Sequence, residues 1–264
     1  RAIDKGKQIH ETIMSKGLLE KDIVLGNALV DMYAKCDMLA KAQEVLRELR
    51  VRDAVSWNTL IAGYTQQGKP QEALNCFEQM ESENFSPNAV TFICILKACG
   101  SLGALDEGIQ IHEKVVRWGL LEIDIHLGVA LIDMYVKCRV LLRAQQTFEE
   151  LPIRAVVSWN ALIAGFIQEQ RGQEALKCFE QMQMEGLCPD TITLICILKA
   201  CGSTRAIDKG KQIHQQIVNR GLLEKDTVLG TALLDMYVKC CALAKAQNML
   251  EELPVRNTVS WCAL

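Results

Sequence analysis

The chain repeats itself every 102 residues, and this period constrains its fold more than any other feature of the sequence. The segment VSWNTLIAGY at Val55–Tyr64 returns as VSWNALIAGF at Val157–Phe166, and its opening returns as VSWCAL at Val259–Leu264. A chain built from such copies forms its core between neighbouring repeats rather than around one centre. The period therefore predicts a repeat architecture in place of one or two globular domains.

Three shorter units of 31, 35 and 36 residues follow one another inside each 102-residue period. Their predicted bounds are 1–22 (partial), 23–53, 54–88, 89–124, 125–155, 156–190, 191–226, 227–257 and 258–264 (partial). Each unit reads as two helices. In the first helix of 54–88, the residues Trp57, Leu60, Ile61 and Tyr64 form one apolar stripe at helical spacing.

One position of every second helix is always small, which predicts a close crossing between helices. Its occupants are Gly6, Ala42, Ala73, Gly108, Ala144, Ala175, Gly210 and Ala246. Gly68, Gly103 and Gly172 are predicted to break the chain between the two helices of a unit. Because two helices alone cannot bury both of their apolar faces, the units must stack on one another. We therefore expect an all-α fold, an α-solenoid (superhelix) of stacked helix-turn-helix repeats.

Composition sets limits on the function. Half of the 264 residues are apolar and the net charge is −3, which is typical of a folded chain and argues weakly against a nucleic-acid partner. Nine of the twelve cysteines recur at equivalent repeat positions, and no C-x-x-C motif occurs, so we expect packing residues in a reducing compartment, not metal ligands. No apolar run is long enough to span a membrane. No catalytic constellation is present, so we expect neither enzymatic activity nor a cofactor.

The beginning of the sequence carries no information on localisation. Arg1 matches Arg205, which stands in the middle of a repeat, so we expect the natural chain to continue upstream. A missing presequence is therefore uninformative.

The unit AVSWNTLIAGYTQQGKPQEALNCFEQMESENFSPN, residues 54–88, resembles a pentatricopeptide repeat. The 31/35/36 alternation is similar to the short, P and long motifs of the plant-type PLS subclass, as are NALVDMYAKC and ILKACGSLGALDEGIQIH. The resemblance implies binding of single-stranded RNA, one base per repeat, in a mitochondrion or chloroplast. It implies C-to-U RNA editing, with editing-complex proteins contacting the long repeats, and no membrane or small-molecule substrate. The deaminase motifs H-x-E and P-C-x-x-C are absent.

The resemblance also assigns roles to residues at fixed repeat positions. The fifth and last residues form the base-reading pair: Asn27 with Asp53, Asn58 with Asn88, Asn160 with Asp190, and Thr231 with Asn257. The second residues sandwich the bases: Val24, Val55, Val90, Val157, Ile192, Val228 and Val259. Lysines at the end of the first helix in the short repeats face the RNA phosphates: Lys35, Lys137 and Lys239.

Several repeats depart from this pattern. The long repeats carry Ile93 and Ile195 at the fifth position, where no hydrogen bond to a base is possible. The repeat 125–155 has Val129 and Ala155 as its pair, with His126 at the sandwiching position, and the last repeat has Cys262 at its fifth position. In the family, Asn/Asp reads uracil, Asn/Asn a pyrimidine with a preference for cytosine, and Thr/Asn adenine. The implied register from the 5′ end is U, C/U, any, any, U, any, A.

Simpler interpretations remain open for each group of residues. Asn58 and Asn160 could instead satisfy backbone donors at a helix N-terminus, and the lysines could simply favour the helix dipole. The repeated histidines are interpreted as surface or packing residues, and the repeated tryptophans as core: His10, His112 and His214, and Trp57, Trp159 and Trp261. For the whole chain, the alternative is a scaffold that binds a peptide or partner helix. A decayed or partial gene product is a third interpretation.

Overall fold

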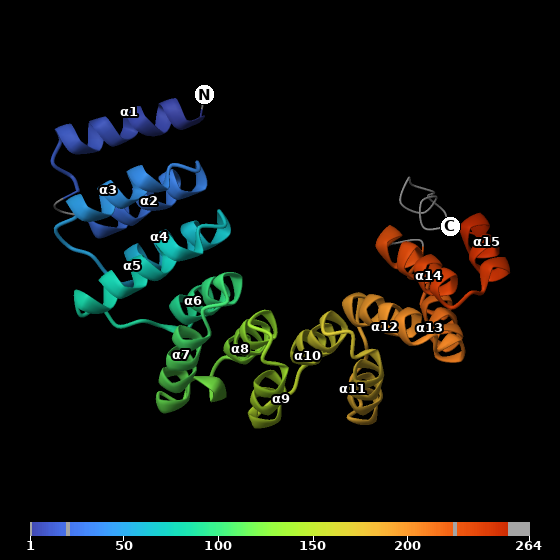
Figure 1. The fold of residues 1–264 in the computed structure, drawn as a ribbon. Helices are drawn as coiled ribbons and strands as arrows, with labels where there is room; N and C mark the ends of the chain where they lie inside the picture. The colour runs from blue at the N-terminus through green and yellow to red at the C-terminus, as the bar shows by residue number, and fades with distance from the viewer. Residues whose placement is uncertain (1, 20–21, 224–225, 253–264) are drawn as a thin grey trace. The chain divides into compact units, whose positions relative to one another are not determined.

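The computed structural model describes residues 2–19, 22–223 and 226–252, and these contain helices and no strand (Figure 1). The helices are α1 (Ala2–Ser15), α2 (Ile23–Lys35), α3 (Leu39–Glu48), α4 (Ala54–Gln66), α5 (Pro70–Ser82), α6 (Ala89–Leu102), α7 (Leu105–Arg117), η1 (Leu120–Glu122), α8 (Ile125–Lys137), α9 (Leu141–Glu150), α10 (Val156–Gln168), α11 (Gly172–Met184), α12 (Thr191–Thr204), α13 (Ile207–Asn219), α14 (Thr227–Lys239) and α15 (Leu243–Glu252). The prediction of an all-α fold is confirmed.

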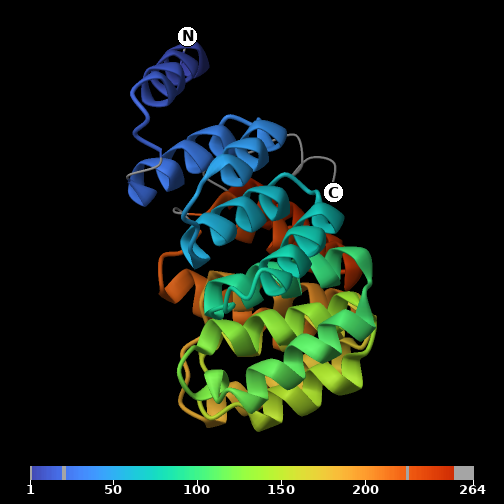
Figure 2. The same cartoon turned by 90° about the vertical axis from the view of Figure 1, so that its left-hand side faces the viewer.

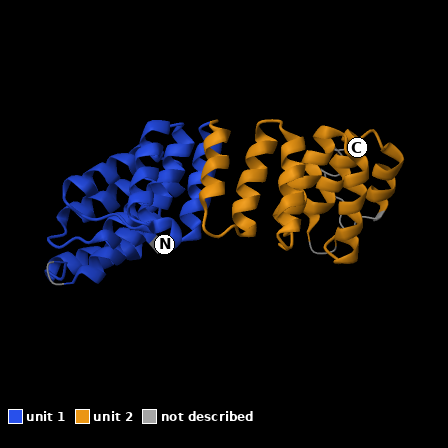
Figure 3. Ribbon diagram, turned by 90° about the horizontal axis from the view of Figure 1, so that it is seen from below, with its two compact units in different colours: residues 1–138 blue, residues 139–264 orange. Residues whose placement is uncertain are grey.

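The chain divides into two compact units, Arg1–Cys138 and Arg139–Leu264, coloured separately in Figure 3. Within the first unit, the first helices of successive repeats, α2, α4, α6 and α8, pack next to one another (Figure 2). The second helices α3, α5 and α7 pack against this row. Within the second unit, α10, α12 and α14 form the corresponding row. Each unit is therefore a stack of helical hairpins, as expected of an α-solenoid.

Each of these first helices begins at the first residue of a predicted repeat: 23, 54, 89, 125, 156, 191 and 227. The apolar stripe of the first helix is buried, with Trp57 and Trp159 each 1% exposed. Trp159 contacts Phe148 of the preceding helix α9 edge to face, with ring centroids 4.5 Å apart. Both tryptophans are core residues as predicted, whereas Trp261 lies outside the described residues.

The small residue of the second helix marks a close crossing with the first helix of the next repeat. A Cβ atom added at Gly6, Gly108 or Gly210 would lie only 2.7, 2.6 or 2.5 Å from a methionine Sδ atom. The methionines are Met32, Met134 and Met236, which occupy one repeat position. This confirms the predicted close crossing and explains why no larger side chain stands there.

The turns inside the hairpins use a residue in the left-handed region, and one predicted turn residue was wrong. Gly68 and Gly103 have φ of 67° and 71°, as expected for glycine in such turns. Gly172, however, is the first residue of α11. The turn before α11 instead places Gln170 at φ 58°, at the repeat position that Gly68 occupies one period earlier.

Replacing Gln170 by glycine should therefore stabilise the protein. The left-handed conformation costs a residue with a Cβ roughly 1–2 kcal/mol, and the greater chain entropy of unfolded glycine offsets part of that. We expect the Gln170→Gly variant to gain about 0.5–1 kcal/mol in chemical denaturation. The reverse change, Gly68→Gln, should lose a similar amount, and two variants with equal stability to the wild type would contradict the argument.

A histidine and a tyrosine join each long repeat to the short repeat that follows. His10, His112 and His214 place Nδ1 2.9, 2.8 and 2.8 Å from the hydroxyls of Tyr33, Tyr135 and Tyr237. The rings meet edge to face. These histidines are therefore packing residues, one of the two roles predicted for them.

Acidification should weaken the packing of His10, which is only 8% exposed. Burial lowers the pKa of His10 below 6.5; Glu48 and Glu11 raise it, and Lys41 lowers it further. The unfolded chain therefore binds a proton at a higher pH than the folded chain, so stability falls as pH drops below about 6.5. A His10→Asn variant should lose less stability than the wild type between about pH 7 and pH 5.5. The exposed His126→Asn serves as control, and an unchanged pH dependence in His10→Asn would refute the argument.

Three cysteines, Cys76, Cys99 and Cys201, are small core residues as expected, whereas Cys188 and Cys241 are exposed. Burial raises the pKa of Cys76 to about 11, and the pKa values of Cys99 and Cys201 to about 12, so these thiols stay protonated. Within the described ranges, no cysteine forms a disulfide and no three His, Cys, Asp or Glu side chains gather as a metal site. Over the same ranges, no helix combines the length and apolar character of a membrane span.

Candidate nucleic-acid interface

A cavity of about 410 Å³ lies in the first unit, where the helices α2, α4 and α6 meet. Asn58 and Asn88, a predicted base-reading pair, line this cavity together with Val55 and Val90, the predicted sandwiching residues of two successive repeats. Lys35 lines it from the end of α2. The structure therefore gathers all three predicted types of site residue around one cavity.

The pairs meet because the last residue of one repeat is the N-cap of the next helix. Asp53, Asn88 and Asp190 have extended backbones and accept hydrogen bonds from the backbone N–H at the third helical residue of α4, α6 and α12. The hydroxyl oxygen of this third residue accepts in turn from the backbone N–H of the capping residue, which completes a capping box. This fixed geometry holds the side chain of each last residue beside the asparagine of the preceding first helix.

Three polar clusters result, each formed by an asparagine, the last residue of its repeat and a hydroxyl from the next repeat. Their members are Asn27, Asp53 and Ser56; Asn58, Asn88 and Thr91; and Asn160, Asp190 and Thr193. The asparagine Nδ2 donates to the last residue over 3.3, 3.1 and 3.1 Å. The hydroxyl donates to the asparagine Oδ1 over 2.5, 2.5 and 2.6 Å.

The carboxylates of the clusters are ionised at neutral pH. Burial raises the pKa of Asp53 and of Asp190, but the hydrogen bonds that each accepts outweigh burial and bring the pKa below its usual value. The donors are the backbone N–H and hydroxyl of the third helical residue, the asparagine amide, and one further backbone N–H. Each aspartate therefore acts only as an acceptor.

The two kinds of pair present different groups to a ligand. Asn27 and Asn160 turn Nδ2 toward a carboxylate, so an amide donor lies next to a carboxylate acceptor. In the other cluster, Asn88 Oδ1 accepts from Thr91 N and from Asn58 Nδ2. The Nδ2 hydrogens of Asn88 therefore point away from these bonds, and a ligand meets two amide donors.

The predicted sandwiching residues are exposed although they are apolar. Exposure ranges from 44% for Val157 to 71% for Val24, and a buried residue directly follows each of them except Val24. The other exposed members are Val55, Val90, Ile192 and Val228. Val259 lies outside the described residues. A row of exposed aliphatic side chains at helix N-termini offers contact surface for flat groups such as bases.

The three predicted phosphate-contacting lysines are exposed at the last residue of their helices. Each forms an i,i+4 ion pair on its own helix: Lys35 with Asp31 (2.7 Å), Lys137 with Asp133 and Lys239 with Asp235 (both 2.8 Å). Such exposed pairs are worth only a few tenths of a kcal/mol, about 0.3–0.5, so a phosphate could compete for the lysine. Both the phosphate role and the helix-dipole role remain predictions.

Not every predicted pair forms a cluster. Thr231 donates to its own helix at Thr227 O (3.0 Å), and its predicted partner Asn257 lies outside the described residues. Ala155 provides no side-chain cap for α10, and the Ser158 hydroxyl donates to Ala155 O instead (2.8 Å). The carboxylates of Asp124 and Asp226, which end the long repeats, accept from the first turn of their own helices.

The alternative role of Asn58 and Asn160 as helix caps is wrong, because Asp53 and Ala155 occupy those cap positions. Our sequence reasoning missed the hydroxyls of Ser56, Thr91 and Thr193. A signal was available: a Ser or Thr stands three residues after the capping residues Asp53, Asn88 and Asp190, as in the capping-box pattern.

Fold and site together define a helical-repeat protein that carries one polar pair at the N-terminal end of its first helices. Two family models match the chain. The model described as PPR repeat family matches residues 52–101 and 154–203, and the model described as PPR repeat matches residues 27–53 and 90–120. These matches cover more than half of the chain, so the protein belongs to the pentatricopeptide repeat family.

Relatives agree with this assignment, and a solved structure shares the fold. A pentatricopeptide repeat-containing protein of Arabidopsis thaliana is 39% identical over 99% of the chain, which spans 46% of that relative. A mitochondrial member from the same plant is 36% identical over 99% of the chain, which spans 47% of it. The crystal structure of PPR10 in complex with an 18-nt psaJ RNA element covers the whole chain at a TM-score of 0.80 and 19% identity, over 40% of its own length. The chain thus spans less than half of these proteins.

Proposed function

We propose that this chain binds single-stranded RNA in a sequence-specific manner, one base per repeat, through the three polar clusters. The observation that carries the proposal is the cavity that Asn58 and Asn88 line together with Val55 and Val90. A base inserted there has an aliphatic side chain on either face and hydrogen-bonding groups at its edge. A crystal structure with RNA exists for the similar PPR10, which supports the proposal.

The donors and acceptors of the clusters favour particular bases. The Watson–Crick edge of uracil places a carbonyl acceptor beside the N3–H donor, whereas cytosine places two acceptors, O2 and N3, side by side. An amide donor next to a carboxylate acceptor therefore suits uracil at Asn27/Asp53 and Asn160/Asp190. Two amide donors suit cytosine at Asn58/Asn88. The proposed register is U, C/U, any, any, U, any, A from the 5′ end, with the last base assigned to Thr231/Asn257.

The biological setting is part of the proposal. The 31/35/36 alternation supports the PLS subclass and a role in C-to-U RNA editing, with deamination carried out by other sequence or by a partner. Mitochondrial and chloroplastic relatives support an organellar location. Comparing organellar transcripts of plants with and without the full-length protein would test this part, and unchanged editing at every site would disprove it.

Binding is tested by titrating a labelled strand that contains U-C-N-N-U-N-A, a copy with the specified bases changed, and the matching duplex, at two salt concentrations. We expect the matched strand to bind best, and an Asn58→Ala, Asn160→Ala double variant to lose that preference. Equal, salt-sensitive binding of both strands would contradict base reading. No binding by the wild type would contradict the proposal as a whole.

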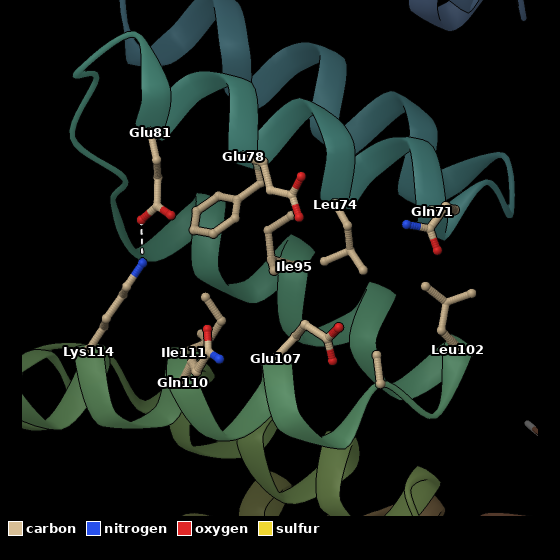
Figure 4. Close-up of a pocket in the computed structure, with 12 residues that line it drawn as sticks. Gln71, Leu74, Glu78, Glu81, Ile95, Leu102, Glu107, Gln110, Ile111 and Lys114 are labelled. Atoms are coloured by element: carbon tan, nitrogen blue, oxygen red, sulfur yellow. Dashed lines mark hydrogen bonds and ion pairs between the residues drawn. The ribbon is translucent and has the colours of Figure 1, made fainter.

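A second surface favours a protein partner at the long repeats. A cavity of about 380 Å³ lies between α5 of repeat 54–88 and α7 of repeat 89–124 (Figure 4). Glu78 and Glu107 line it, Leu74 and Ile111 supply apolar surface, and Lys114 forms an ion pair with Glu81 across one end. This chemistry suits a basic peptide or helix with an apolar anchor, such as a segment of an editing-complex protein or the partner of a scaffold.

The next long repeat provides a natural variant of this surface. Lys209 stands one period after Glu107 and forms an ion pair with Glu180 (2.9 Å), the equivalent of Glu78. A Glu107→Lys variant therefore copies an arrangement that the fold already accepts. Loss of a partner in Glu107→Lys with RNA binding intact would support the protein-binding role, and retention of all partners would exclude this cavity from it.

A further inference from the structure

We propose that the hydroxyl at the third residue of the following repeat is a positioning residue for base recognition. The residues are Ser56, Thr91 and Thr193. Each fixes the orientation of the asparagine amide in the preceding repeat, so that a repeat reads its base only when its neighbour is in place. The inference rests on the proposed RNA binding and extends it to residues outside the base-reading pair.

The hydroxyls are buried, and each proton faces two possible acceptors, the Oδ1 of the asparagine and the Oδ1 of the capping residue. Ser56, Thr91 and Thr193 are all 0% exposed. Each oxygen accepts from the backbone N–H of the capping residue, over 3.3, 3.0 and 3.2 Å. The single hydroxyl proton is left to donate, and the asparagine Oδ1, at 2.5, 2.5 and 2.6 Å, is a closer acceptor than the Oδ1 of the capping residue, at 3.0, 3.2 and 2.8 Å.

The amide orientation follows from these contacts. In the Asn160 cluster, Nδ2 lies 3.1 Å from both carboxylate oxygens of Asp190, and a carboxylate cannot donate, so the amide nitrogen must face it. The amide oxygen then faces Thr193, whose hydroxyl donates to it over 2.6 Å. The carboxylate thus accepts a hydrogen bond from the amide nitrogen, and the hydroxyl donates one to the amide oxygen. Asn160 is only 7% exposed, so little of the amide besides its presented edge remains accessible.

A hydroxyl residue follows every repeat with an asparagine at its fifth position and is absent after the long repeats. Repeats with Asn at the fifth position, 23–53, 54–88 and 156–190, are each followed by a Ser or Thr at the third position. The long repeats have Ile93 and Ile195 at the fifth position, and the repeats that follow carry Leu127 and Leu229 at the third. The hydroxyl is therefore not a general requirement of the helix start.

Two repeats remain, 125–155 and 227–257. The second has Thr231 at its fifth position and is followed by Ser260, which lies outside the described residues, so the first shows what the hydroxyl does without an asparagine. Repeat 125–155 has Val129 at its fifth position and Ala155 as its last residue, and Ser158 follows. The hydroxyl of Ser158 donates to the backbone at Ala155 O, and Ser158 stays buried. Burial of the hydroxyl residue is thus independent of the amide, so a change in base preference would report positioning and not packing.

The test uses Thr193→Val, which removes the hydroxyl and keeps the branched shape, with Thr193→Ser as the conservative control. For each variant we would measure binding to strands with U or C at the base assigned to Asn160/Asp190, and to strands with U or C at the base assigned to Asn58/Asn88. Loss of one hydrogen bond of about 1.4 kcal/mol corresponds to a tenfold change in a binding constant. The preference for U over C at the base assigned to Asn160/Asp190 should therefore fall about tenfold in Thr193→Val. Thr193→Ser should retain the preference, and the other base should be unaffected in both variants. Thermal unfolding would establish that both variants are folded.

The outcomes separate the inference from the function on which it rests. An unchanged preference in a folded Thr193→Val would overturn the inference alone. A wild-type chain without any strand preference would overturn the proposed function and the inference together. In an Asn160→Ala background, Thr193→Val should cause no further change at that base, and an additional loss there would also overturn the inference.

Discussion

Replacing Trp159 by alanine should lower the free energy of unfolding by about 3–5 kcal/mol, the usual cost of truncating a large aromatic side chain in a core. Trp159 is 1% exposed and contacts Phe148 of the preceding repeat edge to face. In a repeat array, stability resides largely in the interfaces between neighbours. The loss should therefore appear in chemical denaturation as a weakened junction between repeats 125–155 and 156–190.

Two further variants sharpen this prediction. Trp118 is 46% exposed, so Trp118→Ala should cost about 1 kcal/mol, in the range of ordinary substitutions. The indole Nε1 of Trp159 is buried, and no hydrogen-bond partner for it occurs among the described residues. A Trp159→Phe variant therefore sacrifices volume but no hydrogen bond and should cost roughly 1–2 kcal/mol. Equal losses in Trp159→Ala and Trp118→Ala would contradict a core role for Trp159.

Exchanging the last residues of repeats 54–88 and 156–190 should exchange their base preferences. Asp190→Asn replaces a carboxylate acceptor with an amide whose oxygen faces Thr193, so the repeat presents two donors and should prefer cytosine to uracil. Asn88→Asp should produce the opposite change in repeat 54–88. Because a well-formed pair of base contacts is worth about 1–3 kcal/mol, each preference should change by roughly 5- to 150-fold.

Both substitutions are expected to leave the fold intact. Asp and Asn are equally good N-caps, and each already occupies this position in one repeat of the chain. Titration of strands that differ only in the base concerned provides the measurement, with the base of the unaltered repeat as internal control. A uniform loss of affinity for all strands would show that the last residue supports binding without selecting the base.

The fold could be predicted from the sequence because its determinants are local and repeated. Apolar spacing around Trp57 and the small residues at Gly108 and Gly210 predicted the helices and their crossings, and the structure confirms both. The turn at Gln170 could not be predicted, because a left-handed residue that is not glycine leaves no compositional signal. Gly172, the nearest glycine, was chosen instead and proved to be helical.

The polar pairs were predicted only through the resemblance to a known family. Asn58 and Asn88 are 30 residues apart, and no periodicity rule connects an asparagine in the second turn of one helix with the N-cap of a later helix. The hydroxyl of Thr91 escaped notice because its bond to Asn58 runs between repeats, over 33 residues. Its bond to Asn88 is local and forms the capping box, from which a contact with the preceding repeat could have been suspected.

The clusters have a consequence for engineering the chain by recombination. Asn160 stands in one repeat, whereas Asp190 and Thr193 stand on either side of the boundary at residue 190. A graft that cuts at the start of a helix would therefore transplant an asparagine without its hydroxyl. The smallest exchangeable module runs from the fourth residue of one repeat to the third residue of the next, and chimaeras joined inside the first helical turn should transfer base preference intact.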